Sequence, residues 1–371
     1  MTTFIGASLR LMRLYHNLSL AELGEEVGVS KQFLSRLETG GEVVSDSLES
    51  SLSEKLQVLP EFFRHIDPMP IAEEQCHFRR QLTTKVALRQ VARARGEMLK
   101  RVIGVLDKHV DLPVYRMDEA DPESTESIEH ATEKFRSLFG LGKGPLSNVT
   151  RIAENAGAVV MRIHGLAQEI DAISFATKRP LIALNDAKKS ACRQRFGIAH
   201  ELGHFALHIG VLTGDRLTEG QANRFASALL LPRSAFASEC RIATRGTRLN
   251  WQGLSELKLR WGVSKAAIIY RGRQLGLFTE EQARAGYIGL KRHGEAIQES
   301  EDYLIVNEEP EVVSDSLKLM KEYYGIPMSA VAREMSVQPR LLQSLLSIPD
   351  PLPEQTSNVV SLQGRERRIT L

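Results

Sequence analysis

The stretch FGIAHELGHFALH, residues 196–208, carries three histidines and one glutamate on an otherwise apolar segment. In an α-helix, His200 and His204 stand on one face, one turn apart. Two imidazole nitrogens in that arrangement can bind one Zn²⁺ at ~2.0–2.1 Å. Glu201 follows the first histidine, where its carboxylate can take a proton from a water molecule that the metal acidifies. The spacing therefore predicts a hydrolytic zinc site with His200 and His204 as ligands and Glu201 as general base.

Such a site needs a third protein ligand, with the fourth position left for water. His208 lies a further turn along, too far from the same ion, so we expect it to orient a ligand or to end the helix. Glu219 is the better candidate, because it lies in the first turn of a second helix that begins near Thr218, whose spacing to Gln221 is that of a capping box. Asn223 follows one turn later, where its amide can orient an imidazole.

Both helices also have interpretations without a metal. A core helix could carry stray histidines, but burying two imidazoles and Glu201 is costly unless they are paired or metal-bound. Glu219 could instead be a solvated carboxylate that the helix dipole favours. Gly203 supports the metal interpretation, since a glycine there lets another element approach the helix closely.

The first 66 residues contain the pattern of a DNA-binding module. Ser19 has capping-box spacing to Glu22 and opens one helix, Gly28 supplies a sharp turn, and Ser30 can cap a second helix. Helix, short turn and a second helix with a polar outer face is typical of helix-turn-helix domains that bind double-stranded operator DNA. The candidate DNA contacts are Lys31, Gln32, Ser35 and Arg36.

At 371 residues the chain is long for one core, and we expect a multidomain protein. The expected parts are an all-α helix-turn-helix domain over residues 1–67, a basic helical connector with an acidic linker over 68–128, an α+β domain over 129–280, and a small, mainly helical C-terminal segment with a mobile tail over 281–371. A glycine-containing break near residues 285–294 supports the last boundary. Eight Lys and Arg stand against one Glu between residues 77 and 101. That basic helix either adds phosphate contacts or is a solvated face.

Three segments share one pattern of apolar and turn positions, namely residues 20–36, 254–270 and 328–344. Any hairpin of two helices needs this spacing to pack, so the second and third copies need not bind DNA. Only the first copy combines the pattern with a polar, partly basic face.

Several features of the sequence indicate the cellular compartment of the protein. Three widely spaced cysteines argue against a disulfide framework and for a reducing environment. No apolar run approaches the ~20 residues that span a bilayer, and the first 20 residues lack the features of a secretory signal. We therefore expect a cytoplasmic protein with no membrane partner.

The paired motifs RQRFGIAHELGHFALH and EGQANRFASALLLP resemble the ImmA/IrrE family of zinc metallopeptidases, and the resemblance extends over roughly residues 130–277. It implies a zincin-like α+β fold, zinc ligands at His200, His204 and Glu219, and a general base at Glu201. It also implies that the substrate is a helix-turn-helix repressor. The N-terminal 65 residues are similar to Cro/cI-type helix-turn-helix domains, although a glutamine common early in that family's second helix is here Leu20.

These observations favour a DNA-binding transcriptional regulator, expected to bind its operator as a homodimer, with a zinc-dependent endopeptidase domain that cleaves a repressor or the chain itself. The alternative is a repressor whose metallopeptidase-like domain only senses a ligand or binds a partner. A third interpretation, a peptidase whose N-terminal module binds protein, fits the polar face around Lys31 and Arg36 less well. A site of two histidines and one glutamate can also hold manganese or iron.

Overall fold

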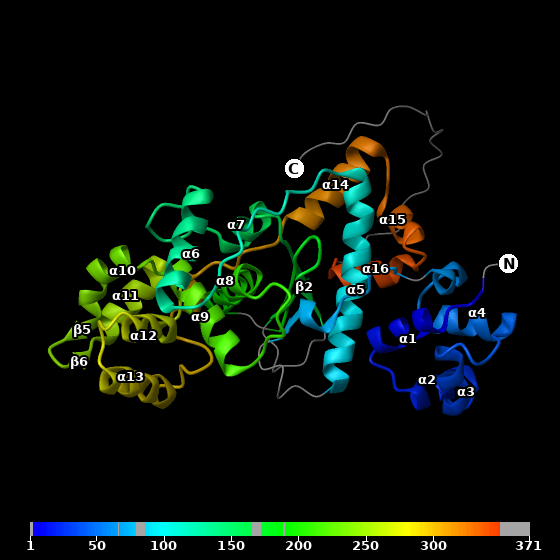
Figure 1. The fold of residues 1–371 in the computed structure, drawn as a ribbon, viewed down its shortest axis with the longest axis horizontal. Coiled ribbons are helices and arrows are strands. Elements are labelled where there is room, and N and C mark those ends of the chain that lie inside the picture. Colours follow the sequence, from blue (N-terminus) through cyan, green and yellow to red (C-terminus); the bar gives the residue numbers. More distant parts are fainter. Residues whose placement is uncertain (1–2, 66, 79–85, 165–171, 188–189, 349–371) are drawn as a thin grey trace.

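The computed structural model describes residues 3–65, 67–78, 86–164, 172–187 and 190–348, and its ribbon is shown in Figure 1. The N-terminal domain is all-helical. It consists of α1 (Gly6–Tyr15), α2 (Leu20–Val27), α3 (Lys31–Glu38), α4 (Asp46–Lys55) and the 3-10 helix η1 (Pro60–Arg64).

The predicted start and end signals of the helix-turn-helix are present. Ser19 and Glu22 form the capping box of α2, and Gly28 ends that helix in the left-handed conformation with a φ of 73°. Ser30 accepts a hydrogen bond from the backbone of Phe33 and caps α3. These local signals fix where each helix begins and ends, and so fix which face of α3 points outward.

A four-stranded sheet in the order β1-β3-β4-β2 lies at the centre of the chain. Strand β4 runs parallel to β2 and antiparallel to β3, and β3 runs antiparallel to β1. The strands are β1 (Cys76–Phe78), β2 (Val159–Ile163), β3 (Ala172–Phe175) and β4 (Leu181–Asn185). The two β-like runs recognised in the sequence, GAVVMRI and RPLIALN, form β2 and β4.

The side chains of the sheet alternate between two hydrophobic cores. Ile173 and Phe175 of β3 join the first core, which also contains α5 (Val86–His109) and the N-terminal helices. Ala172 of β3 joins the second core, with α6 (Thr125–Leu138), α7 (Val149–Asn155), α8 (Ala191–Leu207) and α9 (Arg216–Leu230). Because strand side chains alternate, Ser174 points to the same side as Ala172, toward α8.

Helices α8 and α9 pack closely against each other. A Cβ atom added at Gly203 would lie 3.1 Å from Phe225 and 3.2 Å from Ala222 of α9. The glycine therefore permits the close approach that the sequence indicated. The expected start of the second helix near Thr218 is wrong, because α9 begins after Asp215, whose side chain caps it by accepting from the backbone of Thr218.

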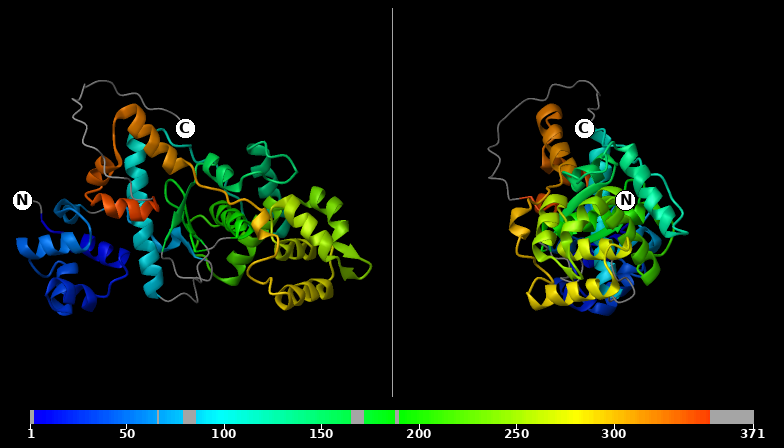
Figure 2. Two further views of the ribbon diagram at one scale, coloured as in Figure 1. Left: turned by 180° about the vertical axis from the view of Figure 1, so that it is seen from behind. Right: turned by 90° about the vertical axis from the view of Figure 1, so that its left-hand side faces the viewer.

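The expected connector over residues 68–128 is part of the folded core. Its residues 76–78 form β1 at the edge of the sheet, and α5 crosses the sheet so closely that a Cβ at Gly96 would lie 2.4 Å from the Phe175 ring. Figures 1 and 2 show α5 standing between the N-terminal domain and the sheet. Sequence periodicity predicted a helix over the residues of α5, but it did not predict that this helix packs between the sheet and the N-terminal domain. Only the extended stretch between α5 and α6 resembles the expected linker.

The expected break near residues 285–294 is wrong, since α13 (Glu280–Arg292) runs through it. Its glycines serve packing, because a Cβ at Gly286 would meet Leu249 and Ile269, and one at Gly289 would meet Trp251. The other elements between α9 and α13 are α10 (Arg233–Glu239), β5 (Thr244–Arg245), β6 (Arg248–Leu249), α11 (Trp251–Trp261) and α12 (Lys265–Gln274).

The C-terminal helices return to the first core. They are α14 (Val312–Tyr324), α15 (Met328–Glu334) and α16 (Pro339–Leu346). Helices α14 and α15 contact α5, and α14 and α16 contact β2; the left view of Figure 2 shows these helices beside α5. The expected mobile tail, beyond Pro349, lies outside the described residues. In the part of the chain that is described, no helix is both long and apolar enough to cross a membrane.

All three similar segments fold as hairpins of two helices. The second is α11 with α12, and the third is α15 with α16. The turn residue is left-handed in each, with a φ of 73° at Gly28, 63° at Gly262 and 57° at Ser336. In the second segment, residues 254–270, Lys265 is buried in ion pairs with Glu295 and Glu301. The polar face of this segment is therefore covered.

Candidate metal centre

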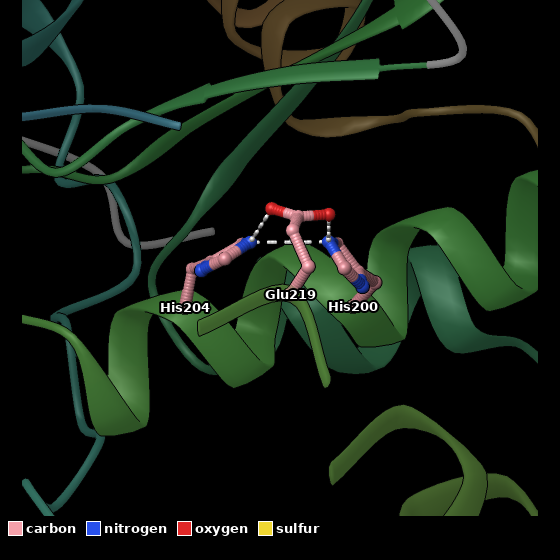
Figure 3. A group of neighbouring side chains, drawn as sticks. All are labelled: His200, His204 and Glu219. Atoms are coloured by element: carbon pink, nitrogen blue, oxygen red, sulfur yellow. Dashed lines mark hydrogen bonds and ion pairs between the residues drawn. The ribbon is translucent and has the colours of Figure 1, made fainter. Parts of the chain in front are cut away.

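Helices α8 and α9 bring three of the predicted site residues together. His200 and His204 lie one turn apart on α8, and Glu219 projects from the first turn of α9 (Figure 3). Their ligating atoms all lie within 4.8 Å of one another. The Nε2 atoms of His200 and His204 are 3.0 Å apart. Glu219 Oε2 lies 3.5 Å from His200 Nε2, and Glu219 Oε1 lies 3.3 Å from His204 Nε2. Three lone-pair donors thus converge on one point.

Hydrogen bonds behind the imidazoles decide which nitrogens face that point. His200 Nδ1 donates to the amide oxygen of Asn223 at 3.1 Å, because that oxygen can only accept. Gln221 Oε1 accepts from His208 Nε2 at 2.9 Å, which leaves His208 Nδ1 to accept from His204 Nδ1 at 3.0 Å. Both ligand candidates are thereby left with an unprotonated Nε2, the form of histidine that binds a divalent metal.

The electrostatics of the site favour a cation. Burial lowers the pKa of His204 to about 3 and keeps its imidazole neutral. Glu219 Oε1 is buried and has no hydrogen-bond partner among the described residues. A divalent cation would satisfy this oxygen and both Nε2 atoms, so these three residues fit a zinc ion.

Strand β3 holds Glu201. Ser174 Oγ donates a hydrogen bond to Glu201 Oε2 at 2.5 Å. His200, Glu201 and His204 are between 1% and 3% exposed, so this carboxylate and both imidazoles are shielded from solvent. A carboxylate that a hydrogen bond orients, and that follows a metal-ligand candidate directly in the chain, is suited to general base catalysis.

A residue from outside the predicted motifs completes the site. His77 of β1 stacks on His204, with ring centroids 4.9 Å apart and an interplanar angle of 6°. Its Nδ1 lies 2.8 Å from Thr213 Oγ1, whereas its Nε2 is buried without a hydrogen-bond partner among the described residues. His77, Thr213 and Ser174 were not found from the sequence, since none of them lies at a ligand spacing from the histidine helix.

The predicted DNA contacts lie together on the outer face of α3. Lys31, Gln32, Ser35 and Arg36 are all exposed. Arg36 pairs with Glu42 through a 2.6 Å contact between Nε and Oε1. The apolar side of α3 is buried through Leu34 and Leu37, which orients the four polar side chains toward solvent.

Two parts of the chain match models of known protein families. Residues 153–272 match the family model of the IrrE N-terminal-like domain, Peptidase_M78, and residues 5–60 match that of a helix-turn-helix domain. The chain is thus a fusion of a helix-turn-helix domain with an IrrE N-terminal-like domain, and the predicted fusion is confirmed. No curated protein matches the chain.

Proposed function

We propose that this chain is a DNA-binding transcriptional regulator whose IrrE N-terminal-like domain is a zinc-dependent endopeptidase. The observation that carries the proposal is the convergence of His200, His204 and Glu219 beside the oriented carboxylate of Glu201. The substrate is a cytoplasmic helix-turn-helix repressor or the chain itself. Hydrolysis of a repressor is irreversible, so derepression would persist until new repressor is made.

Each residue has a separate part in this chemistry. His200, His204 and Glu219 would hold the zinc, which when bound supplies a Lewis acid for the substrate carbonyl and for water. The Glu201 carboxylate takes a proton from the attacking water and delivers it to the leaving amine, while Ser174 keeps that carboxylate in place. Asn223 and His208 keep both imidazoles in the tautomer that offers Nε2.

The competing proposal is a regulator whose metal domain only senses a ligand. Zinc ligands alone would serve a sensor, and a sensor has no use for a carboxylate beside them. The hydrogen bond from Ser174 to Glu201 therefore favours the peptidase.

The decisive experiment uses wild-type protein, Glu201→Gln and Glu219→Gln. Each is loaded with zinc, its metal content is measured, and it is incubated with the helix-turn-helix repressor encoded beside it. We expect about one zinc per chain in the wild type and Glu201→Gln, less in Glu219→Gln, and a discrete repressor fragment with wild type only. Zinc binding without cleavage of the repressor or of the chain itself would instead support the sensor.

A further inference from the structure

Strand β1 lies where the sheet borders the metal centre. It pairs antiparallel with β3, and His77 stands opposite Ser174, the residue that holds Glu201. The same His77 stacks on His204. One three-residue strand therefore touches both the residue that orients the general base and a metal-ligand candidate.

The strand also closes the site. His200, Glu201 and His204 are almost fully buried, and His77 is only 1% exposed. A protein substrate must bring a backbone carbonyl next to Glu201 and the metal ligands. It cannot do so while β1 and its histidine fill that space.

If β1 moved away, β3 would become the edge of the sheet, because the order is β1-β3-β4-β2. A free edge presents unpaired backbone N–H and C=O groups that pair with any extended chain of suitable register. A chain segment bound there antiparallel, as β1 is, would run past Ser174 and Glu201 with its backbone beside the base.

We propose that β1 blocks the metal centre as an internal stand-in: it occupies the edge of β3 at which an extended segment of the peptidase substrate would pair, and the substrate must displace it. The part about the substrate rests on the proposed peptidase function. The displacement of β1 does not, and it can be measured without catalysis.

The backbone pairing that attaches β1 to the sheet is short. The ladder is three residues long and is extended by Ala176, whose backbone N–H donates to Gln75 O at 2.8 Å. The Gln75 side chain adds two bonds, accepting from Ala72 N at 2.9 Å and donating to Ala176 O at 3.0 Å. Gln75 touches neither the metal ligands nor Glu201, so changing it loosens β1 and leaves the site residues intact.

Gln282 provides a matched control. Its side chain accepts from Thr279 N at 2.9 Å and donates to Thr247 O at 3.2 Å, the same two kinds of bond at a distant place. Gln75→Ala and Gln282→Ala therefore lose equivalent interactions, and only the first loosens β1.

Thiol labelling measures the opening of β1. Cys76 lies in this strand and is buried, as are the other two cysteines. In a Cys192→Ala, Cys240→Ala background, the reaction rate of Cys76 with a disulfide reagent reports exposure of the strand. We expect Gln75→Ala to raise this rate roughly tenfold, the effect of losing two neutral hydrogen bonds, and Gln282→Ala to leave it unchanged. Equal rates in both variants would overturn the proposal.

Peptide binding measures docking. A fluorescein-labelled peptide with the sequence of residues 71–78 is titrated against zinc-loaded protein carrying Glu201→Gln, so that no turnover occurs. We expect saturable binding at least tenfold tighter in Gln75→Ala than in Gln282→Ala. If β1 opens and the peptide does not bind, the docking surface is refuted. If the peptide binds and no protein is ever cleaved, the peptidase proposal fails and the docking surface stands.

A second variant guards against misfolding. Gln75→Glu keeps the acceptor for Ala72 N, but its carboxylate loses the donor to Ala176 O and is repelled by that carbonyl. It should raise the labelling rate with an unchanged circular dichroism spectrum. A labelling rate no different from that of the wild type would contradict the role given to the Gln75 side chain.

Discussion

Asn223 offers the sharpest test of how the metal centre is built. It makes one hydrogen bond to the site, from His200 Nδ1 to its amide oxygen at 3.1 Å, and it binds no metal itself. Asn223→Leu keeps the approximate shape of the side chain and removes the acceptor. His200 can then rotate or adopt the other tautomer, in which Nε2 carries the proton and cannot bind zinc.

The loss of such a hydrogen bond typically weakens metal affinity by about 10- to 100-fold, or roughly 1.4–2.8 kcal/mol. We expect the lower part of this range, because His204 and Glu219 remain and His204 keeps its own partner in His208. The zinc dissociation constant is measured by competition with a chromophoric chelator at constant pH.

Asn148→Ala is the matched control. Asn148 also uses one side-chain oxygen, accepting from the backbone of Arg151 as the cap of α7, a helix that carries none of the metal-ligand candidates. Asn148→Ala should lower the free energy of unfolding by about 1 kcal/mol and leave zinc affinity unchanged. If Asn223→Leu binds zinc as tightly as the control, the hydrogen bond does not orient His200 and the inferred tautomers are wrong.

Three further predictions concern packing, pH and DNA. Gly203→Ala should destabilise the protein by about 1–3 kcal/mol in urea unfolding, because the new Cβ lies 3.1 Å from α9. A Cβ at Gly197 in the same helix would have no atom within 4 Å, so Gly197→Ala should stabilise the protein by up to ~1 kcal/mol. Equal effects of the two substitutions on the free energy of unfolding would contradict the packing argument. Burial raises the pKa of Glu154 to about 7, so folding takes up a proton between about pH 4.5 and 7 and stability falls as pH rises through that window. Glu154→Gln should flatten this dependence in urea midpoints measured across the window, and an unchanged slope would exclude Glu154 as its source. Lys31→Ala should reduce the salt slope of binding to random-sequence duplex DNA by about one, while an exposed lysine in another domain, Lys143, should have no effect when replaced by alanine. If Lys143→Ala lowered the salt slope and Lys31→Ala did not, DNA would not bind at α3.

The local signals in the sequence were sufficient for the helices that carry chemistry. The four-residue spacing of His200 and His204 places both on one face of any helix, and caps such as Ser19 and Ser30 act within three residues. Helix periodicity and caps also predicted the outward face of α3 and the helix-hairpin pattern that the three similar segments share. It placed the start of α9 at the wrong cap, because Thr218 and Asp215 are both competent and only the folded chain selects one.

Contacts between distant segments were decided by the tertiary structure alone. His77 and His204 are separated by 127 positions, and no spacing rule links a residue of a basic connector to a metal ligand. The glycines of α13 were mistaken for a break, because a glycine that ends a helix and one that admits a neighbouring side chain look alike in sequence. The sequence by itself determined which residues can bind a metal and which helix can face DNA. The tertiary structure determined what surrounds them, since the strand that closes the metal centre is held by pairing with β3 and not by any pattern of its own.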